Sequence, residues 1–198
     1  MAADMARRRS LARPSFRIER SALDADARTC LHVIASYTVS QVSLRRMRAD
    51  EFDTWASNAI EAFAIDLSAA TGTQRDLALA QANEQFPHLL PNGVDTADTW
   101  VMVIEDTTGN RVGTIWIGPH PTNENAAFVW DIKIDEPRQG QGLGRAAMLA
   151  AEELAVNDGH SEIGLNVFGS NERAQELYTS LGYRVVSTTM AKDLPTSP

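Results

Sequence analysis

Residues 134–145 read Ile-Asp-Glu-Pro-Arg-Gln-Gly-Gln-Gly-Leu-Gly-Arg and stand between an apolar, strand-like segment and an Ala-rich, helical one. Glycine lets the backbone approach a ligand closely, and the amino end of a helix carries about half a positive charge. A phosphate or pyrophosphate is therefore the ligand that this strand-to-helix turn favours. The structural alternative is a tight turn that binds nothing.

Two common nucleotide-binding patterns do not fit this context. A P-loop ends in Gly-Lys-Ser/Thr, and the only lysines of the chain are Lys133 and Lys192. A dinucleotide-binding unit needs the spacing G-x-G-x-x-G and room for further strand–helix units. The spacing here is G-x-G-x-G, and few residues follow Gly144.

The rest of the chain alternates between strand-like and helical periods. Apolar residues recur at every second position over 42–47 and at three- and four-residue spacing over 52–67. Strands that follow one another in the middle of the chain favour an antiparallel meander, and the last third requires a parallel crossover. We expect an α/β fold with a mixed sheet, built from a strand at 42–47, helices at 50–71 and 73–86 (the second stopped by Pro87), strands at 99–105, 111–118 and 126–134, a helix at 143–157, a strand at 162–168, a helix at 171–181 and a strand or hairpin at 183–192.

A family resemblance is carried by Gln139-Gly140-Gln141-Gly142-Leu143-Gly144, which is similar to the signature Gln/Arg-x-x-Gly-x-Gly/Ala of the GNAT superfamily of N-acetyltransferases. A second element, Asn171 to Tyr178 followed by Leu181-Gly182-Tyr183, resembles the family's N-x-x-A-x-x-L-Y-x-x-x-G-F/Y helix. Two motifs in the family's order are more specific than either alone. The resemblance covers residues 42–194 and implies a GNAT-like fold, with an antiparallel meander before a βαβα unit that carries a phosphate-binding strand-to-helix loop.

The resemblance implies that acetyl-CoA is the acetyl donor and that the backbone of residues 139–145 wraps its pyrophosphate. It also implies that Ile132 and Ile134 pair through their backbone with the pantetheine arm, while Asn171 and Tyr178 line the far side of the cofactor. By this resemblance the acetyl-CoA-binding residues are Ile132, Ile134, Gln139, Gly140, Gln141, Gly142, Leu143, Gly144, Arg145, Asn171, Ala174 and Tyr178.

Direct attack of a primary amine on a thioester needs one group that takes the amine's proton and another that protonates the departing thiolate. The phenol of Tyr178 suits the second task, and packing of its ring against the sheet is the structural alternative. Family members often place a carboxylate on the strand before the loop, but the positions expected to face the acceptor hold Phe128 and Trp130. Asp131 has the opposite parity unless a β-bulge turns it, and Glu124 is the other candidate base. A water relay, or an amine that arrives neutral, is the remaining option.

Aromatic side chains are expected near the acceptor. Three of the four tryptophans fall in the expected strands, where core packing is the common role and a wall over an ammonium group is the functional alternative. The first two helices shape the acceptor site in the resembled fold. We therefore expect Phe52, Trp55 and Phe63 to influence substrate choice.

The sequence favours neither a disulfide nor a metal site. Cys30 is the only cysteine, and the four histidines are scattered without metal-binding spacing. A cytoplasmic location is expected, and no membrane partner, because no run of residues is long and apolar enough to span a bilayer.

Charge divides the chain into two parts. Residues 1–48 have a net charge of +6 and the remainder has −14, within a total of −8. We expect residues 1–41 to be a basic, poorly ordered N-terminal extension, with a later start at Val39 or Val42 and a phosphate-touching arm as alternatives. We expect residues 42–194 to be the acetyltransferase domain and residues 195–198 a C-terminal tail. The acidic domain argues against nucleic acid as a partner and slightly favours a cationic acceptor.

The sequence leaves the acceptor open among a protein N-terminus, a lysine, a polyamine and an aminoglycoside-like compound. A domain that binds acyl-CoA without transferring anything, as a sensor or regulatory module, is the competing hypothesis. The lack of a carboxylate at the expected strand positions favours that alternative. Homodimers are frequent in the resembled family, so a homodimer is the oligomeric state to test.

Overall fold

The computed structural model describes residues 37–39, 41–192 and 194, so most of the predicted N-terminal extension and the predicted tail at 195–198 lie outside the described residues. The sheet nevertheless reaches back to Tyr37, because β1 (Tyr37–Val39) pairs with β2 (Val42–Arg46). The sheet therefore begins a few residues before residue 42, where we expected the domain to start.

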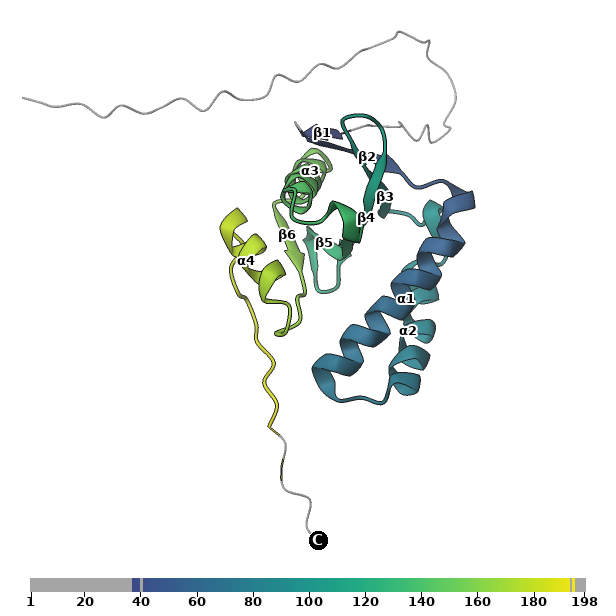
Figure 1. Cartoon of the computed structure of the whole chain (residues 1–198), viewed down its shortest axis with the longest axis vertical. Coiled ribbons are helices and arrows are strands. Elements are labelled where there is room, and N and C mark those ends of the chain that lie inside the picture. The colour runs from purple at the N-terminus through teal and green to yellow at the C-terminus, as the bar shows by residue number, and fades with distance from the viewer. Residues whose placement is uncertain (1–36, 40, 193, 195–198) are drawn as a thin grey trace, which may run out of the picture. The chain divides into compact units, whose positions relative to one another are not determined.

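The six strands of the described residues form one mixed sheet in the order β1-β2-β3-β4-β5-β6 (Figure 1). Neighbours from β1 to β5 are antiparallel, and β5 and β6 are parallel. The later strands are β3 (Trp100–Asp106), β4 (Arg111–His120), β5 (Asn123–Ile134) and β6 (Glu162–Leu165). A meander followed by a parallel pair confirms the predicted fold class.

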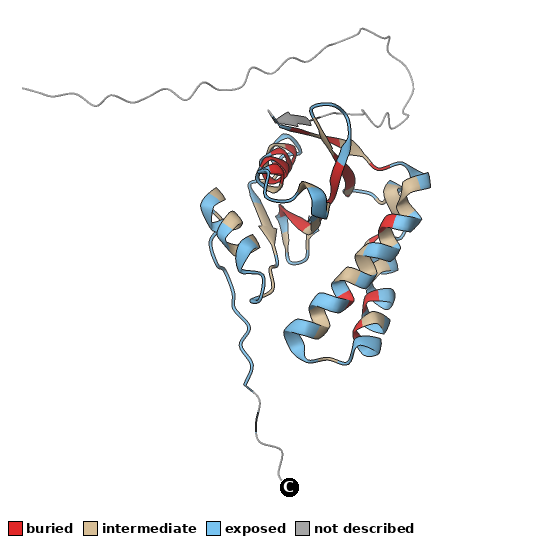
Figure 2. Cartoon of the chain, viewed as in Figure 1, coloured by how far each residue is buried: buried red, intermediate tan, exposed pale blue. Residues whose placement is uncertain are grey.

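Helices cover both faces of the sheet. α1 (Ala49–Thr71) and α2 (Arg75–Leu89) pack on one face around Trp55 and Trp116, while α3 (Leu143–Asn157) packs on the other through a buried, mostly alanine face (Figure 2). α4 (Glu172–Leu181) has no buried residue and borders the α3 side. Short 3-10 helices lie at Gly93–Asp95 and Glu136–Arg138. Among the described helices, none is both long and apolar enough to cross a membrane.

Ion pairs tie the start of α1 to the sheet. Arg45 of β2 lies 3.0 Å from the carboxylate of Glu51 and 2.7 Å from that of Glu105 on β3. Glu51 also accepts the backbone N–H of Arg48, at 2.9 Å. The hydrogen bond from Arg45 lowers the pKa of Glu51 to about 2. These contacts fix the direction in which α1 leaves the sheet, and so the position of residues further along it.

Two expected elements differ in the structure. Pro87 does not stop α2, because it falls in the last turn, where the lost N–H removes a single hydrogen bond and the helix continues to Leu89. The strand or hairpin expected at 183–192 is not formed, and Val185 is 82% exposed there. A strand is stable only against a partner, and these residues pair with no strand of the described chain.

Candidate functional site

The glycine-rich turn joins the end of β5 to α3. Gly140 and Gly142 have φ angles of +77° and +80°, which side-chain-bearing residues rarely adopt, so glycine is required at both. Side-chain amides hold the turn from within: Gln139 Nε2 donates to the carbonyl of Ile134 at 3.0 Å, and Gln141 Nε2 donates to that of Pro137 at 3.3 Å. These hydrogen bonds hold the turn in its conformation, and the residues of the turn are exposed.

The amino end of α3 has free hydrogen-bond donors. Gly142 occupies the N-cap position and has no side chain to accept the first backbone N–H groups of the helix. Arg145 lies in the first turn and donates to the hydroxyl of Ser180 on α4, and Arg173 Nη1 donates to Gln139 Oε1 at 3.4 Å. Backbone donors and two guanidinium groups thus gather at one exposed point of an acidic chain, which is the chemistry that binds phosphate.

Leu143 and Gly144 pack the end of the loop against the rest of the protein. Leu143 is buried in the α3 core, and a side chain on Gly144 would contact Leu177 of α4. Asn171 caps α4, because its side-chain oxygen accepts the N–H of Ala174 at 3.1 Å. Of the predicted cofactor-binding residues, the structure therefore brings the loop and α4 together.

A gap opens between the two parallel strands. β5 and β6 pair only from Ala126 opposite Glu162 to Val129 opposite Leu165. β5 then continues to Ile134 without β6, so none of the described strands lies on that side of its backbone from residue 130 onward. Ile132 and Ile134, the residues predicted to pair with the pantetheine arm, lie on this unpaired stretch, which leads directly to the glycine loop.

A β-bulge lies in β5 at the start of that stretch. Ile117 of β4 pairs with Val129, but the next residue, Trp116, pairs with Asp131, so Trp130 is the extra residue. Paired residues point to the same face of a sheet. Trp116 points toward α1 and α2, and Asp131 therefore faces that side too, as the sequence allowed only if a bulge was present.

Burial dominates the electrostatics of Asp131. Desolvation raises the pKa of its carboxyl from 3.8 to about 6; the positive charge of Lys133 opposes this shift and the negative charge of Asp66 adds to it. Asp66 lies on α1, so the negative charge of a second carboxylate, carried by a helix, acts on Asp131. Sequence reasoning missed Asp66, because nothing in its local pattern marks one acid on an exposed helix face.

Tyr178 lies on α4, half-buried beside Tyr183, with ring centroids 5.8 Å apart. Burial raises the pKa of the Tyr178 phenol, and the negative charge of Asp131 raises it further. The phenol therefore stays protonated at neutral pH and lies near the Asp131 carboxylate. The charge of Asp131 thus acts on Tyr178, although Asp131 faces α1 and α2 and Tyr178 packs against the α3-side core.

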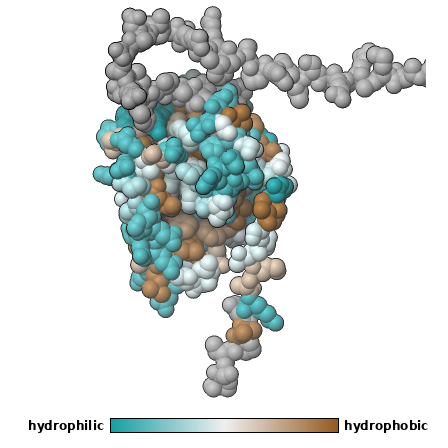
Figure 3. Space-filling view, turned by 180° about the vertical axis from the view of Figure 1, so that it is seen from behind, coloured by the Kyte–Doolittle hydropathy of each residue, from teal (hydrophilic) through white to brown (hydrophobic). Residues whose placement is uncertain are grey.

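Aromatic rings surround the same side of the sheet. Trp130 stacks on Trp116 with centroids 5.5 Å apart, and Phe128 meets Trp130 at 4.9 Å. Phe63 of α1 lies 6.4 Å from Phe168 in the loop after β6. Seen from behind, the protein shows hydrophobic surface among hydrophilic side chains (Figure 3). Of the predicted aromatics, Trp55 and Trp116 are buried core residues, whereas Phe63 is exposed.

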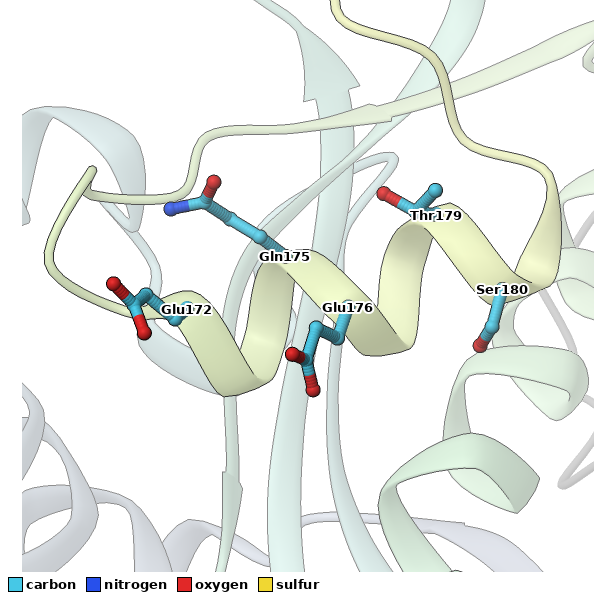
Figure 4. A pocket seen from close by; sticks show the side chains of 5 residues that line it. All are labelled: Glu172, Gln175, Glu176, Thr179 and Ser180. Carbon is cyan, nitrogen blue, oxygen red and sulfur yellow. The ribbon is translucent and has the colours of Figure 1, made fainter.

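Glu124 lies apart from this region. It is exposed, near the start of β5, and seven residues along the strand separate it from Asp131, or roughly 20 Å. A hollow on the solvent-facing side of α4 is also separate (Figure 4): its lining residues are Glu172, Gln175, Glu176, Thr179 and Ser180, none of them a predicted site residue. Within the described residues, no group of three or more His, Cys, Asp and Glu side chains could hold a metal ion.

Comparison with known proteins gives one family. A model of the acetyltransferase (GNAT) family matches residues 63–183. The chain is 27% identical over 154 residues to the uncharacterized N-acetyltransferase YdgE of Bacillus subtilis, a match that covers 77% of this chain and 98% of that protein. It is 28% identical over 143 residues to mycothiol acetyltransferase of Clavibacter sepedonicus, which covers 72% of this chain but 43% of that protein.

A solved structure agrees with this match. The crystal structure of YycN from Bacillus subtilis, also named an uncharacterized N-acetyltransferase, superposes with a TM-score of 0.73 at 26% identity. The alignment covers 78% of this chain and 99% of that one.

Proposed function

Because the chain belongs to the acetyltransferase (GNAT) family and is an acyltransferase, we propose that it moves an acetyl group from acetyl-CoA to a primary amine, by direct attack of the amine on the thioester. The observation that carries this proposal is the uncapped amino end of α3 at the glycine loop, directly after the stretch of β5 that β6 does not cover.

The donor set of the loop fits acetyl-CoA. The uncapped amino end of α3, with Arg145 and Arg173 beside it, offers N–H groups and positive charge to a pyrophosphate. The unpaired backbone at Ile132 and Ile134 offers strand-type hydrogen bonds to an extended amide chain such as pantetheine. When bound, acetyl-CoA supplies an activated acetyl group as a thioester.

Asp131 is the group that we propose takes the amine's proton. A carboxyl with a pKa of about 6 is mostly ionised at neutral pH and is a stronger base than an exposed aspartate. The sensor alternative drew its support from the lack of a carboxylate facing the acceptor, and the bulge removes that objection. The Asp131 and Asp66 charges and the surrounding rings favour a cationic amine with an apolar neighbouring group.

Tyr178 is the group that we propose protonates the departing thiolate. Its raised pKa keeps the phenolic proton in place across the neutral range, and its ring packs against the α3-side core. Glu124 remains an alternative base only if an acceptor extends far along β5.

The experiment is release of free CoA thiol from acetyl-CoA in the presence of a panel of amines, with mass spectrometry of the acceptor. We expect thiol release that depends on the amine, and an acceptor that gains one acetyl group. Binding of acetyl-CoA without amine-dependent thiol release from any acceptor class would favour the sensor reading instead.

A further inference from the structure

His120 ends β4 on the face of the sheet that α1 and α2 cover. Trp116, Gly118 and His120 alternate along β4, so their side chains leave the same face. Trp116 belongs to the core under α1 and α2, and a Cβ on Gly118 would lie 3.3 Å from Nε1 of Trp130. Asp131 pairs with Trp116 and faces the same side. His120 therefore shares a face of the sheet with the proposed base.

The imidazole of His120 lies over β5 and β6. Its ring meets the ring of Phe128 edge-on, with centroids 5.2 Å apart and planes at 84°. A Cβ on Gly164 of β6, which pairs with Phe128, would lie 3.2 Å from Cδ2 and 3.4 Å from Nε2 of His120. Phe128 in turn meets Trp130. The rings thus form a row that leads from His120 to the bulge at Trp130.

One nitrogen of the His120 ring is already occupied. Nδ1 accepts the backbone N–H of Thr122 at 3.2 Å, and the Thr122 hydroxyl lies 3.5 Å from the same nitrogen. A ring nitrogen that accepts a hydrogen bond carries no proton, so the neutral ring has its proton on Nε2. Within the described residues Nε2 has no hydrogen-bond partner, and His120 is only half-buried. An N–H donor is therefore available at the end of the row of rings.

The two ends of this row have different chemistry. At one end the negative charge of Asp66 acts on Asp131, which suits an ammonium group. At the other end His120 offers a neutral N–H, which suits an oxygen that accepts a hydrogen bond. Asp131 lies opposite Trp116, and four residues of β4 lead from Trp116 to His120, so the backbones at the two ends are roughly 13 Å apart. An extended chain with an apolar middle matches this arrangement.

We propose that His120 determines which amine is accepted: its Nε2–H donates to a carbonyl oxygen of the acceptor while the amine lies at Asp131. The acceptor is then a straight-chain amine whose far end carries an amide or peptide carbonyl, with its apolar chain along Phe128 and Trp130. The net charge of −8 disfavours a carboxylate in place of the carbonyl. An amine without such an oxygen forgoes this hydrogen bond. This inference rests on the proposed acetyl transfer and narrows its substrate class.

The first experiment compares straight-chain ω-amino amides, from propyl to octyl chains, with the alkylamines of the same chain length. Release of CoA thiol from acetyl-CoA gives kcat and KM for each probe. Wild-type protein should favour the amide, for at least one chain length, by at least about fivefold in kcat/KM, as one hydrogen bond between neutral groups would give. His120→Phe keeps a ring beside Phe128 and removes the donor, so this preference should disappear, through a higher KM for the amide. His88→Phe is the matched control: His88 is exposed in the last turn of α2, and this variant should keep the preference.

A second measurement tests the position of the ring proton without turnover. Nitrogen NMR spectra in mildly alkaline buffer, assigned by comparison with His120→Phe, should show the His120 ring with its proton on Nε2. A ring with the proton on Nδ1, equal kcat/KM for the two series at every chain length, or a preference that His120→Phe retains would each overturn the proposal. Thiol release with no amine of either series is a different result, because it contradicts the acetyl transfer itself.

Discussion

The carboxyl of Asp131 holds a proton more tightly in the fold than in the unfolded chain, because burial raises its pKa from 3.8 to about 6. Below about pH 4 the carboxyl is protonated in both states, and its ionisation costs no stability. The cost grows between about pH 4 and pH 6 and reaches about 3 kcal/mol above that range. Asp131→Asn should raise Tm by several degrees at pH 7.5, and by about half as much at pH 5. Asp98→Asn, at an exposed position, is the control, and an equal gain at both pH values for Asp131→Asn would contradict this account.

The same group sets the expected pH dependence of the reaction. If Asp131 accepts the amine's proton, kcat/KM should fall tenfold per pH unit below about pH 6, and Asp131→Asn should lose this limb together with a hundredfold or more in rate, by the roughly 10²–10⁴ range of acid–base catalysis. Asp66→Asn removes a negative charge that raises the pKa of Asp131, so it should move the limb to lower pH. If Asp66→Asn leaves the acid limb of the kcat/KM profile at the same pH, a group other than Asp131 titrates in that limb.

Tyr178 and Tyr183 form a natural pair of test and control. Tyr178→Phe should lower kcat by about a hundredfold with little change in the KM for acetyl-CoA, because it removes the proton donor and keeps the ring. Tyr183→Phe removes a buried hydroxyl that lies beside Glu152 and is not a predicted site group, so turnover should not fall. Equal effects of the two substitutions on kcat would return Tyr178 to a packing role.

At the scale of single residues, the sequence nominates candidate groups for the chemistry but does not give their geometry. It named Tyr178 and Asp131 but could not decide which way Asp131 points, since a bulge depends on pairing with β4 and leaves no local mark. It could not find Asp66 either, because that carboxylate matters only through the fold that brings α1 over β5.

At the scale of elements, the loop before α3 is the part most open to a direct test. Gly142→Ala should weaken acetyl-CoA binding by at least about tenfold, because Gly142 has a φ of +80° and its exposed backbone offers the helix N–H groups. Gly159 has a φ of +94° just beyond the other end of α3, so Gly159→Ala should introduce a comparable backbone strain and cost stability without loss of affinity. Calorimetric titration with acetyl-CoA checks both, and equal affinity in the two variants would mean that the loop does not bind the cofactor.

Local signals predicted some elements well and others poorly. The bounds of α3 follow from the glycines at both ends and an alanine-rich face, and the structure has the predicted 143–157. The two strand–helix units in the last third of the chain were also recognisable, because the spacing of the apolar residues changes where each strand ends and each helix begins. The strand expected at 183–192 is absent, since strand formation depends on a partner that the local sequence does not specify.

At the scale of the whole molecule, acetyl-CoA should stabilise the fold. A ligand that binds only the folded state adds about 2.7 kcal/mol at one hundred times its dissociation constant, which raises Tm by several degrees. Thermal melting with acetyl-CoA, with CoA and without ligand measures this, and Gly142→Ala should show a smaller rise. No rise with wild-type protein at millimolar acetyl-CoA would remove the basis of the proposed cofactor.

The extra residue in β5 places two consecutive side chains, Trp130 and Asp131, on the same face of the sheet. Removal of Trp130 would restore regular alternation with Asp131 still opposite Trp116, so the carboxylate would keep its face and one aromatic ring would be lost from it. A one-residue insertion or deletion in this strand can therefore add or remove a side chain on that face while Asp131 stays in place. Alignments that compare only residue identities would record such an event as a neutral gap.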